Sequence, residues 1–362
     1  MNIKINKISK LRAIILLNFL LITSFLVLFS CGNAPAAVSS VTAPNWVTSI
    51  ESAYPASEWV AVVGQGNNQP VAESNAMNAL ARVFRTDVAS LTQSSQQFSQ
   101  IISSSANNRS ISFDESQNFS QDVNVSTNVH GLIGVQIDVY RSPDNTVFVC
   151  ARMNRRESAA RYSGMIRENT AIINSLLTSA VPNGTFDAYA RLSFAHAIAK
   201  VTDNFQNILE VLDPSAAGRR PGYGGADAIR TRMVECASLI TIGVAVNTER
   251  PADTTLFTRA AGSFFRDLGF RINEQGQGNY VLRVNVRFEE LTQSVISCRF
   301  FLDAVLENER GTAIFSFTED DRRAHPNNAS EARRLAVQAV ENSFKEDKFA
   351  GEFDSWLNSF IN

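Results

Sequence analysis

Few side chains in this chain of 362 residues are placed for chemistry, and none forms a known catalytic pattern. The three histidines, His130, His196 and His325, share no metal-ligand spacing. Serine is abundant, but no G-x-S-x-G nucleophile elbow occurs. Gly64 and Gly66 follow an apolar run, yet the third glycine of a dinucleotide-binding fingerprint is missing. We therefore expect no catalytic residue, no cofactor and no metal, and interpret the glycine pair as a tight strand-to-helix turn.

Cys31 is the residue most clearly placed for a covalent reaction. Four basic residues and no acidic residue occur before residue 13, and residues 13–29 are almost wholly apolar. A basic start, an apolar stretch and a small residue at a cleavage point are typical of a secretory signal. The apolar stretch is short for a membrane span of about 20 residues. An uncleaved membrane anchor and ordinary secretion stay open as alternatives.

Leu28, Phe29, Ser30 and Cys31 together resemble the lipobox of bacterial lipoproteins. In that family an aliphatic residue stands three positions before the cysteine, and a small residue directly precedes it. Phe29 departs from the strict pattern, and looser lipoboxes of this kind are typical of spirochaetes. The resemblance implies cleavage before Cys31, a diacylglycerol on its thiol, and acylation of the new amine with a chain such as palmitate.

The segment after Cys31 has the composition of a flexible tether. Residues 32–44 are small, free of charge and proline-bearing, and as a coil they span on the order of 20 Å. We expect a body held by its lipid in the bacterial cell envelope, at the outer membrane facing the periplasm. Removal of residues 1–30 changes the formal net charge from −2 to −6, which argues against a nucleic-acid partner.

Hydrophobic periodicity predicts two domains of one α+β pattern. In the first half it predicts a strand at 59–64, an amphipathic helix at 70–91, paired strands at 133–139 and 147–151, and a helix at 155–180. In the second half it predicts a strand at 236–246, a helix at 255–268, strands at 280–291, 295–306 and 312–317, and a last helix. Asn328 and Glu331 form a capping box at its start, and the acidic run 319–321 is expected at a strand end or turn. We read both halves as β-α-β-β-α, with helices packed on sheets.

A long antiparallel αα-hairpin is predicted between the two domains. Its second helix, residues 185–212, would be about 40 Å long, and we expect Ser193 and Asn204 to be exposed on it. Glycine and proline cluster at 213–227, which indicates a linker between independently folded halves. The predicted organisation is a signal peptide 1–30, a lipidated tether 31–44, an α+β domain 45–180, the long helix 181–212, a linker 213–235 and a second α+β domain 236–362.

The first domain is similar to the twenty-kilodalton bacterial outer-membrane lipoprotein family and to the N-terminal domain of the flagellar T-ring assembly protein. The similarity covers residues 44–178 and follows the order Pro-x-Trp, Tyr-Pro, a strand ending in Gly-x-Gly and an alanine-rich helix. The motif residues are Trp46, Tyr54, Pro55, Gly64 and Gly66. The second half is similar in topology to the periplasmic TolB domain and to the curli secretion lipoprotein. The resemblance implies an envelope location and an α+β fold, and it brings no enzymatic residue.

Three cysteines remain in the body once Cys31 carries lipid. We interpret Cys150, Cys236 and Cys298 as small buried side chains. Because Cys236 and Cys298 both lie on apolar faces of predicted strands, a disulfide between them stays open.

The sequence as a whole predicts a non-enzymatic lipoprotein that acts as a structural or assembly component through protein–protein contacts. Binding of peptidoglycan or another envelope glycan is the alternative, and a hydrolase is a third. The identity of the protein partner and the formation of a homo-oligomer are left open.

Overall fold

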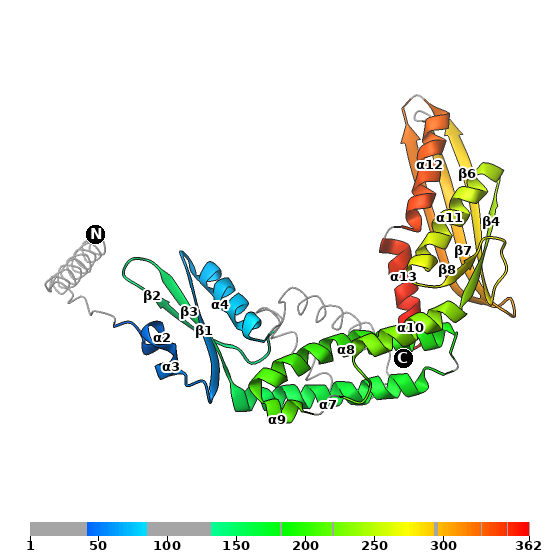
Figure 1. The fold of residues 1–362 in the computed structure, drawn as a ribbon. Helices are drawn as coiled ribbons and strands as arrows, with labels where there is room; N and C mark the ends of the chain where they lie inside the picture. Colours follow the sequence, from blue (N-terminus) through cyan, green and yellow to red (C-terminus); the bar gives the residue numbers. More distant parts are fainter. Residues whose placement is uncertain are drawn as a thin grey trace, which may run out of the picture. The chain divides into compact units, whose positions relative to one another are not determined.

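The computed structural model describes residues 42–84, 132–181, 183–218, 221–292, 296–326, 328–345 and 347–361. Residues 45–362 form one compact unit. The unit 45–362 contains two β-sheets with helices packed on them, which confirms the predicted α+β class (Figure 1). Within the described ranges, no helix has the length and apolarity that a membrane span requires. The apolar stretch 13–29 lies outside them.

The first sheet has three antiparallel strands in the order β1-β3-β2. The elements here are α2 (Asn45–Thr48), α3 (Ile50–Ala53), β1 (Trp59–Gly66), α4 (Gln69–Val83), β2 (Gln136–Arg141) and β3 (Val147–Asn154). Helix α4 begins where the sequence predicts, because the Asn68 side chain accepts a hydrogen bond from the Val71 amide and proline occupies the first turn. Asn145 has a φ of 65° in the turn between β2 and β3, as tight hairpins require, so the predicted strand pair is confirmed.

Helices α7 (Arg155–Ser179) and α8 (Phe186–Leu212) form the predicted antiparallel hairpin. Tyr162 packs edge-on against Phe205, and the Asn169 amide donates to the Thr202 hydroxyl at 3.0 Å. From the first pair to the second, the residue number rises along α7 and falls along α8, so the two helices are antiparallel. Ser193 and Asn204 are half-buried and not exposed, because α8 contacts α9, α10 and α13 as well as α7.

The predicted linker is wrong over most of its length. Residues 213–235 contain α9 (Pro214–Ala217) and most of α10 (Ala226–Leu239). Gly224 and Gly225 both adopt positive φ, so the glycine cluster forms a turn that leads into α10. Asp203 of α8 fixes this turn by accepting hydrogen bonds from the Tyr223 hydroxyl and the Ala226 amide. The predicted strand at 236 therefore begins only after the helix.

The second sheet has five strands in the order β5-β4-β6-β7-β8. They are β4 (Thr241–Thr248), β5 (Arg271–Asn273), β6 (Tyr280–Thr292), β7 (Ile296–Asn308) and β8 (Ala313–His325), and α11 (Pro251–Asp267) follows β4. Strand β4 pairs in parallel with β5 and β6, whereas β6, β7 and β8 are antiparallel. The second half is thus richer in strands than the β-α-β-β-α pattern that the sequence predicts.

Strand β8 forms an edge of this sheet and continues well beyond its predicted end at residue 317. The acidic run 319–321 consequently lies within the strand and not in a turn. Its register places Glu319, Asp320 and Asp321 opposite Leu302, Phe301 and Phe300 of β7. Pairing with the apolar strand β7 keeps this charged sequence extended.

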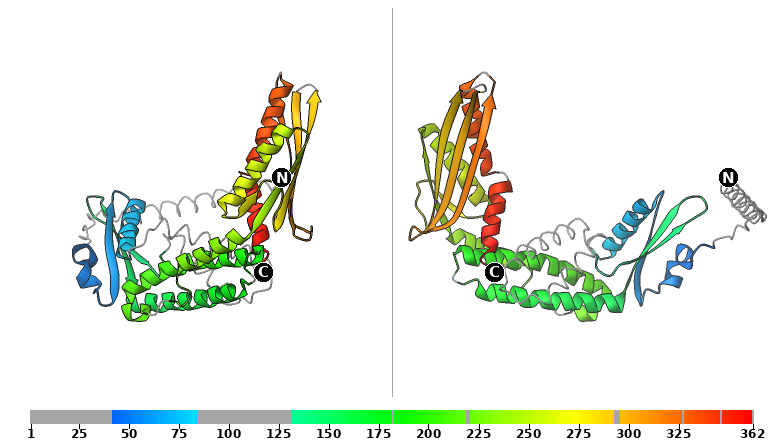
Figure 2. Two further views of the ribbon diagram at one scale, coloured as in Figure 1. Left: turned by 45° about the vertical axis from the view of Figure 1, so that its right-hand side comes forward. Right: turned by 180° about the vertical axis from the view of Figure 1, so that it is seen from behind.

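Helices α11, α12 (Ala329–Ser343) and α13 (Asp347–Asn358) cover one face of the second sheet (Figures 1 and 2). The Asn328 side chain accepts from the Glu331 amide, which confirms the predicted start of α12, but the single helix expected here is two helices. Buried phenylalanines fill the space between the helices and the sheet, and Phe265 lies edge-on to both Phe349 and Phe353. The opposite face of the sheet carries polar side chains.

Candidate functional site

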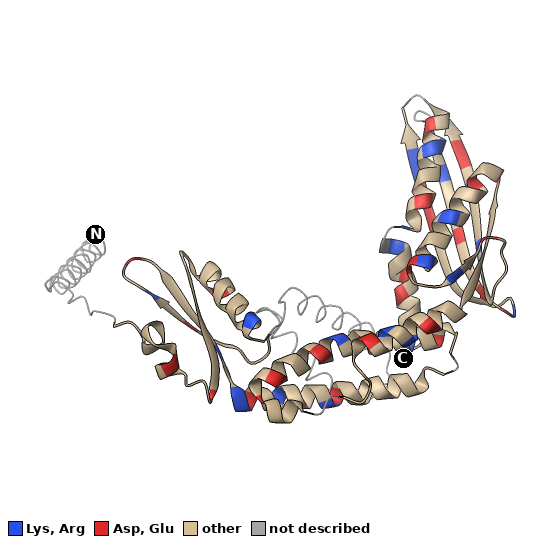
Figure 3. Ribbon diagram, viewed as in Figure 1, with Lys and Arg blue, Asp and Glu red and all other residues tan. Residues whose placement is uncertain are grey.

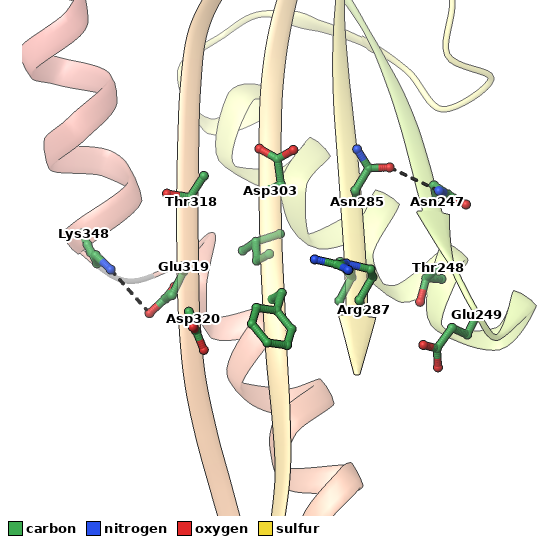
Figure 4. A pocket seen from close by; sticks show the side chains of 13 residues that line it. Asn247, Thr248, Glu249, Asn285, Arg287, Asp303, Thr318, Glu319, Asp320 and Lys348 are labelled. Carbon is green, nitrogen blue, oxygen red and sulfur yellow. Dashed lines mark hydrogen bonds and ion pairs between the residues drawn. The ribbon is translucent and has the colours of Figure 1, made fainter. Parts of the chain in front are cut away.

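The polar face of the second sheet contains a hollow of about 740 Å³ (Figure 4). Strands β4, β6, β7 and β8 form it, together with Glu249, which follows β4, and Lys348 of α13. Its lining residues are Asn247, Thr248, Glu249, Asn285, Val286, Arg287, Phe301, Leu302, Asp303, Thr318, Glu319, Asp320 and Lys348. Acidic and basic residues are interspersed over this domain (Figure 3).

Strand register aligns four of these side chains in one row across the sheet. Asn247 pairs with Asn285, Asn285 with Asp303, and Asp303 with Thr318. Alternation along each strand places all four on the face opposite the helices, while their neighbours Val286 and Leu302 are buried. We call these four residues the amide row, and Figure 4 shows them side by side.

A second row lies two residues further along the strands and contains an aromatic ring. Arg287 pairs with Phe301, and Phe301 with Asp320. The guanidinium carbons of Arg287 and Arg299 lie 5.3 and 4.7 Å from the centre of the Phe301 ring. Arg299 also binds Asp320 through two nitrogens, and these hydrogen bonds hold the pKa of Asp320 below its ordinary value. We call Arg287, Phe301 and Asp320 the aromatic row.

Several polar side chains of the hollow are available to a ligand, whereas polar side chains elsewhere on this face pair with one another. Outside it, Arg283 pairs with Glu307 at 2.8 Å. Inside it, the side chains of Arg287, Asp303 and Thr318 have no hydrogen bond or ion pair with any residue that the structure describes. Within the amide row, the Asn247 amide donates to Asn285 at 3.2 Å. Among the other lining residues, Asp320 pairs with Arg299, Glu319 with Lys348 and Glu249 with Arg333. The site can thus donate and accept hydrogen bonds and offer one aromatic ring.

The motif residues predicted from the sequence lie elsewhere, in the first domain. Trp46 is buried in α2, and the Pro55 carbonyl accepts from the amides of the turn that leads into β1. Tyr54 donates its hydroxyl to Asp138 at 2.7 Å, and Asp138 also accepts from Arg152 at 2.9 Å. The Arg152 guanidinium lies over the Tyr54 ring and over that of Trp59. These contacts attach the segment before β1 to the sheet.

Ionisation within this cluster follows from its contacts. Burial and the hydrogen bond to Asp138 raise the pKa of Tyr54 to about 12. Burial opposes the charge of Asp138, but the hydrogen bonds from Tyr54 and Arg152 outweigh it and hold the pKa of Asp138 below its ordinary value. The cluster therefore holds a stable ion pair.

Gly64 and Gly66 have a packing role and not the turn role that the sequence predicts. Both lie inside β1, where α4 crosses the strand. A Cβ atom at Gly64 would lie 2.2 Å from the Ala76 nitrogen, and one at Gly66 would lie 2.8 Å from the Ala72 nitrogen. The glycines allow a helix backbone to contact a strand backbone.

The histidines and cysteines weighed in the sequence do not line the hollow, whereas Glu319 and Asp320 of the acidic run do. His196 approaches the Ala226 carbonyl at 3.1 Å, and burial lowers its pKa. Cys150, Cys236 and Cys298 are all buried and free, so the disulfide that the sequence left open is absent. Cys236 lies on α10 and not on a strand. Within the described ranges, no three histidine, cysteine or acidic side chains are grouped so as to hold a metal ion.

Residues 28–31 and His130 lie outside the described ranges, so the structure adds nothing to the predicted lipid site at Cys31 or to its lipobox residues.

Sequence reasoning missed both rows of the hollow. The alternation of exposed and buried residues in β6 and β7 is visible in the sequence. The assembly of Asn247, Asn285, Asp303 and Thr318 depends on strand order and register, which the alternation does not encode.

Comparisons with known proteins give only distant likenesses. No protein-family model matches the chain, and no curated protein matches it. A secreted protein from Helicobacter pylori is 12% identical with a TM-score of 0.35, covering 79% of this chain and 97% of its own. A minor lipoprotein from Acinetobacter baumannii is 15% identical with a TM-score of 0.23, covering 30% and 93%. A lipoprotein from Neisseria meningitidis is 15% identical with a TM-score of 0.21, covering 29% and 97%. At these TM-scores the likenesses assign neither a family nor a function, and the resemblance of residues 44–178 to the twenty-kilodalton lipoproteins stays a prediction.

Proposed function

We propose that this chain is a bacterial envelope lipoprotein, anchored by lipid on Cys31 at the outer membrane and facing the periplasm. The basic start, the apolar stretch and the lipobox residues 28–31 support the proposal, because together they match a secretory signal followed by a lipobox in which only Phe29 departs from the strict pattern. More than one acyl chain provides stable anchoring, where a single chain gives only marginal binding.

Metabolic labelling tests the anchor. Cells grown with labelled palmitate should incorporate label into the wild-type protein and into the control variant Cys150→Ala, since Cys150 is buried in the first domain. The variant Cys31→Ala should incorporate none. Label retained on Cys31→Ala would contradict lipidation at this cysteine.

We also propose that the folded unit, residues 45–362, acts through protein–protein contacts. One observation supports this. Two large apolar side chains are exposed near the turn of the αα-hairpin: Val181 by 71% and Leu239 by 50%. Leu239 of α10 packs next to Gly184 of this turn, and Arg232 of the same helix reaches the Leu177 carbonyl at the end of α7. We call Val181 and Leu239 the turn patch. Apolar groups exposed together are typical of contact surfaces.

Membrane anchoring makes a small contact surface effective. A partner that is also held at the membrane meets this protein at a high effective concentration, so a modest affinity is sufficient. The short tether of residues 32–44 keeps the body near that partner.

Crosslinking in intact cells tests the role of the turn patch. Val181→Glu and Leu239→Glu should lose most of a crosslinked species that the wild type forms, because a charge at an apolar contact is costly to desolvate. Val71→Glu is the matched control, since Val71 is 43% exposed on α4 of the first domain. Equal crosslinking of all three variants would show that the turn patch makes no contact.

A further inference from the structure

We propose that the hollow on the second sheet binds an uncharged, linear oligosaccharide that lies across the strands between the amide row and the aromatic row. This inference goes beyond the proposed function and does not depend on the turn patch.

The shape of the site follows from strand geometry. The two rows are two residues apart along each strand, which separates them by about 7 Å, and neighbouring strands are about 4.8 Å apart. The amide row crosses four strands and is therefore about 14 Å long. Between the rows, Val286 and Leu302 point into the core, so backbone forms the floor of a shallow trough. A linear chain of sugar rings advances by nearly one strand spacing per ring and fits along this trough.

The polar groups of the trough match hydroxyl groups. Asp303 can only accept hydrogen bonds and Arg287 can only donate them, whereas the Asn285 amide and the Thr318 hydroxyl can do both. A ligand that satisfies this mixture must carry groups that donate and accept at short intervals, as a sugar does. The half-buried Phe301 ring lies beneath the guanidinium groups of Arg287 and Arg299, and a sugar ring would pack against this aromatic–guanidinium group.

The charge of the hollow argues against an anionic ligand. Four carboxylates line it, from Glu249, Asp303, Glu319 and Asp320, against the two cations Arg287 and Lys348. Three of the carboxylates are already paired, Asp320 with Arg299, Glu319 with Lys348 and Glu249 with Arg333. Asp303 carries an unpaired negative charge in the centre of the amide row, where a phosphate would be repelled.

A peptide strand fits this face less well. Peptides that add to sheets bind at an edge through free backbone groups. Strands β6 and β7 lie inside the sheet, so both of their edges are paired with neighbouring strands. Only side chains are offered to a ligand on this face.

Weak binding is expected because the trough is shallow and its polar groups are well hydrated. A Kd on the order of 1 mM is typical for such a site with few apolar contacts. Many lipid-anchored copies facing one polymer would raise the overall avidity.

The test uses the full-length lipidated protein in a zwitterionic detergent, since sugar-based detergents would compete. The probes are chitotetraose, cellotetraose and maltotetraose, with binding followed by saturation-transfer NMR and titration calorimetry. At least one of the three should bind, and Asn285→Ala and Asp303→Ala should each weaken that binding about tenfold. These side chains are exposed, and circular dichroism would show that the variants keep their fold.

Matched variants on the same face make the test specific. Arg287→Gln should weaken binding, while Arg283→Gln should not, because Arg283 lies outside the hollow on the same strand. Thr318→Val and Ser316→Ala form a second such pair on β8. The proposal is overturned if none of the three sugars binds, if the variants inside and outside the hollow bind equally, or if inorganic phosphate competes for the site.

Discussion

At Gly64 the strand β1 and the helix α4 approach so closely that a methyl group would meet the backbone of Ala76 at 2.2 Å. Both contact partners are backbone, so a rotamer change cannot relieve the overlap. Gly164, in the middle of α7, has no atom within 4 Å of an added Cβ. The two glycines therefore differ in physical role although both lie in regular structure.

Alanine at these two positions should change stability in opposite directions. Gly64→Ala should lower the free energy of unfolding by about 3 kcal/mol or more, because overpacking forces α4 away from β1. Gly164→Ala should raise it by about 0.5–1 kcal/mol through helix propensity. Urea denaturation of both variants measures this, and a Gly64→Ala protein as stable as wild type would contradict the close approach.

The Tyr54–Asp138–Arg152 cluster should show itself in pH dependence. Because the pKa of Asp138 is lowered in the folded state, its contribution is present above the ordinary value of 3.8 and is lost as the pH falls through the folded pKa. Asp138→Asn should lower stability at pH 7 by about 1–2 kcal/mol, since the carboxylate is one-third exposed.

Thermal denaturation between pH 7 and 3 checks this prediction. The stability difference between wild type and Asp138→Asn should shrink at the acidic end. Asp187→Asn is the control, because its helix-surface pair with Arg191 should contribute less than about 0.5 kcal/mol. A constant difference at all pH values would show that the charge of Asp138 is not what stabilises the cluster.

The sequence shows which residues are present, but it does not show which residues they contact in the fold. Gly64 and Gly66 were expected in a turn because glycine is common there, and no pattern reveals that a helix backbone crosses above them. The same holds for Asp303 and Thr318, which are ordinary exposed strand residues until the register of β4, β6, β7 and β8 aligns them with Asn247 and Asn285.

Among the elements, the long helices were predictable because their apolar residues repeat over many turns. Helix α8 begins and ends within one residue of its predicted bounds. Helix α10 was missed because its buried face is short and built partly from small residues such as Ala226 and Ala237. The cluster of glycines in front of it favoured a linker. In the structure those glycines provide the turn that lets α10 pack against α8.

Phe186, the first residue of α8, links this helix to the second sheet. Its ring lies 4.6 to 6.0 Å from those of Phe270, Tyr280, Phe353 and Trp356. Phe186→Ala should lower the free energy of unfolding by about 3–5 kcal/mol, as is usual for buried phenylalanine. Phe360→Ala should have a smaller effect, because Phe360 is only half-buried. Equal losses measured by urea denaturation would contradict the central role of Phe186.

For the whole molecule, the contacts of Phe186 argue against two independently folded halves. Tyr189 of the same helix lies 4.7 Å from Phe270, and Arg191 donates to the Phe360 carbonyl. The second domain thus uses the start of α8 as part of its own core. Sequence periodicity could not show this, since it reports which face of a helix is buried and not which element covers it.

Two fragments test this dependence. A fragment of residues 226–362 should unfold at a lower urea concentration than a fragment of residues 183–362, because the first lacks Phe186 and Tyr189 and exposes the aromatic rings that they cover. Identical midpoints for the two fragments would show that the second domain is complete without α8.

The edge strand β8 bears on the membrane anchoring that we propose. A lipid-anchored protein diffuses in two dimensions and meets its own copies often, so an unprotected sheet edge would invite strand pairing between neighbours. Along β8 the sequence from Glu319 to Arg323 places three acids and two arginines in succession. Two copies that met edge to edge would have to bring these charges into one ladder and remove them from water. For a protein anchored as proposed here, the charges of β8 would oppose the pairing of neighbouring copies into a continuous sheet.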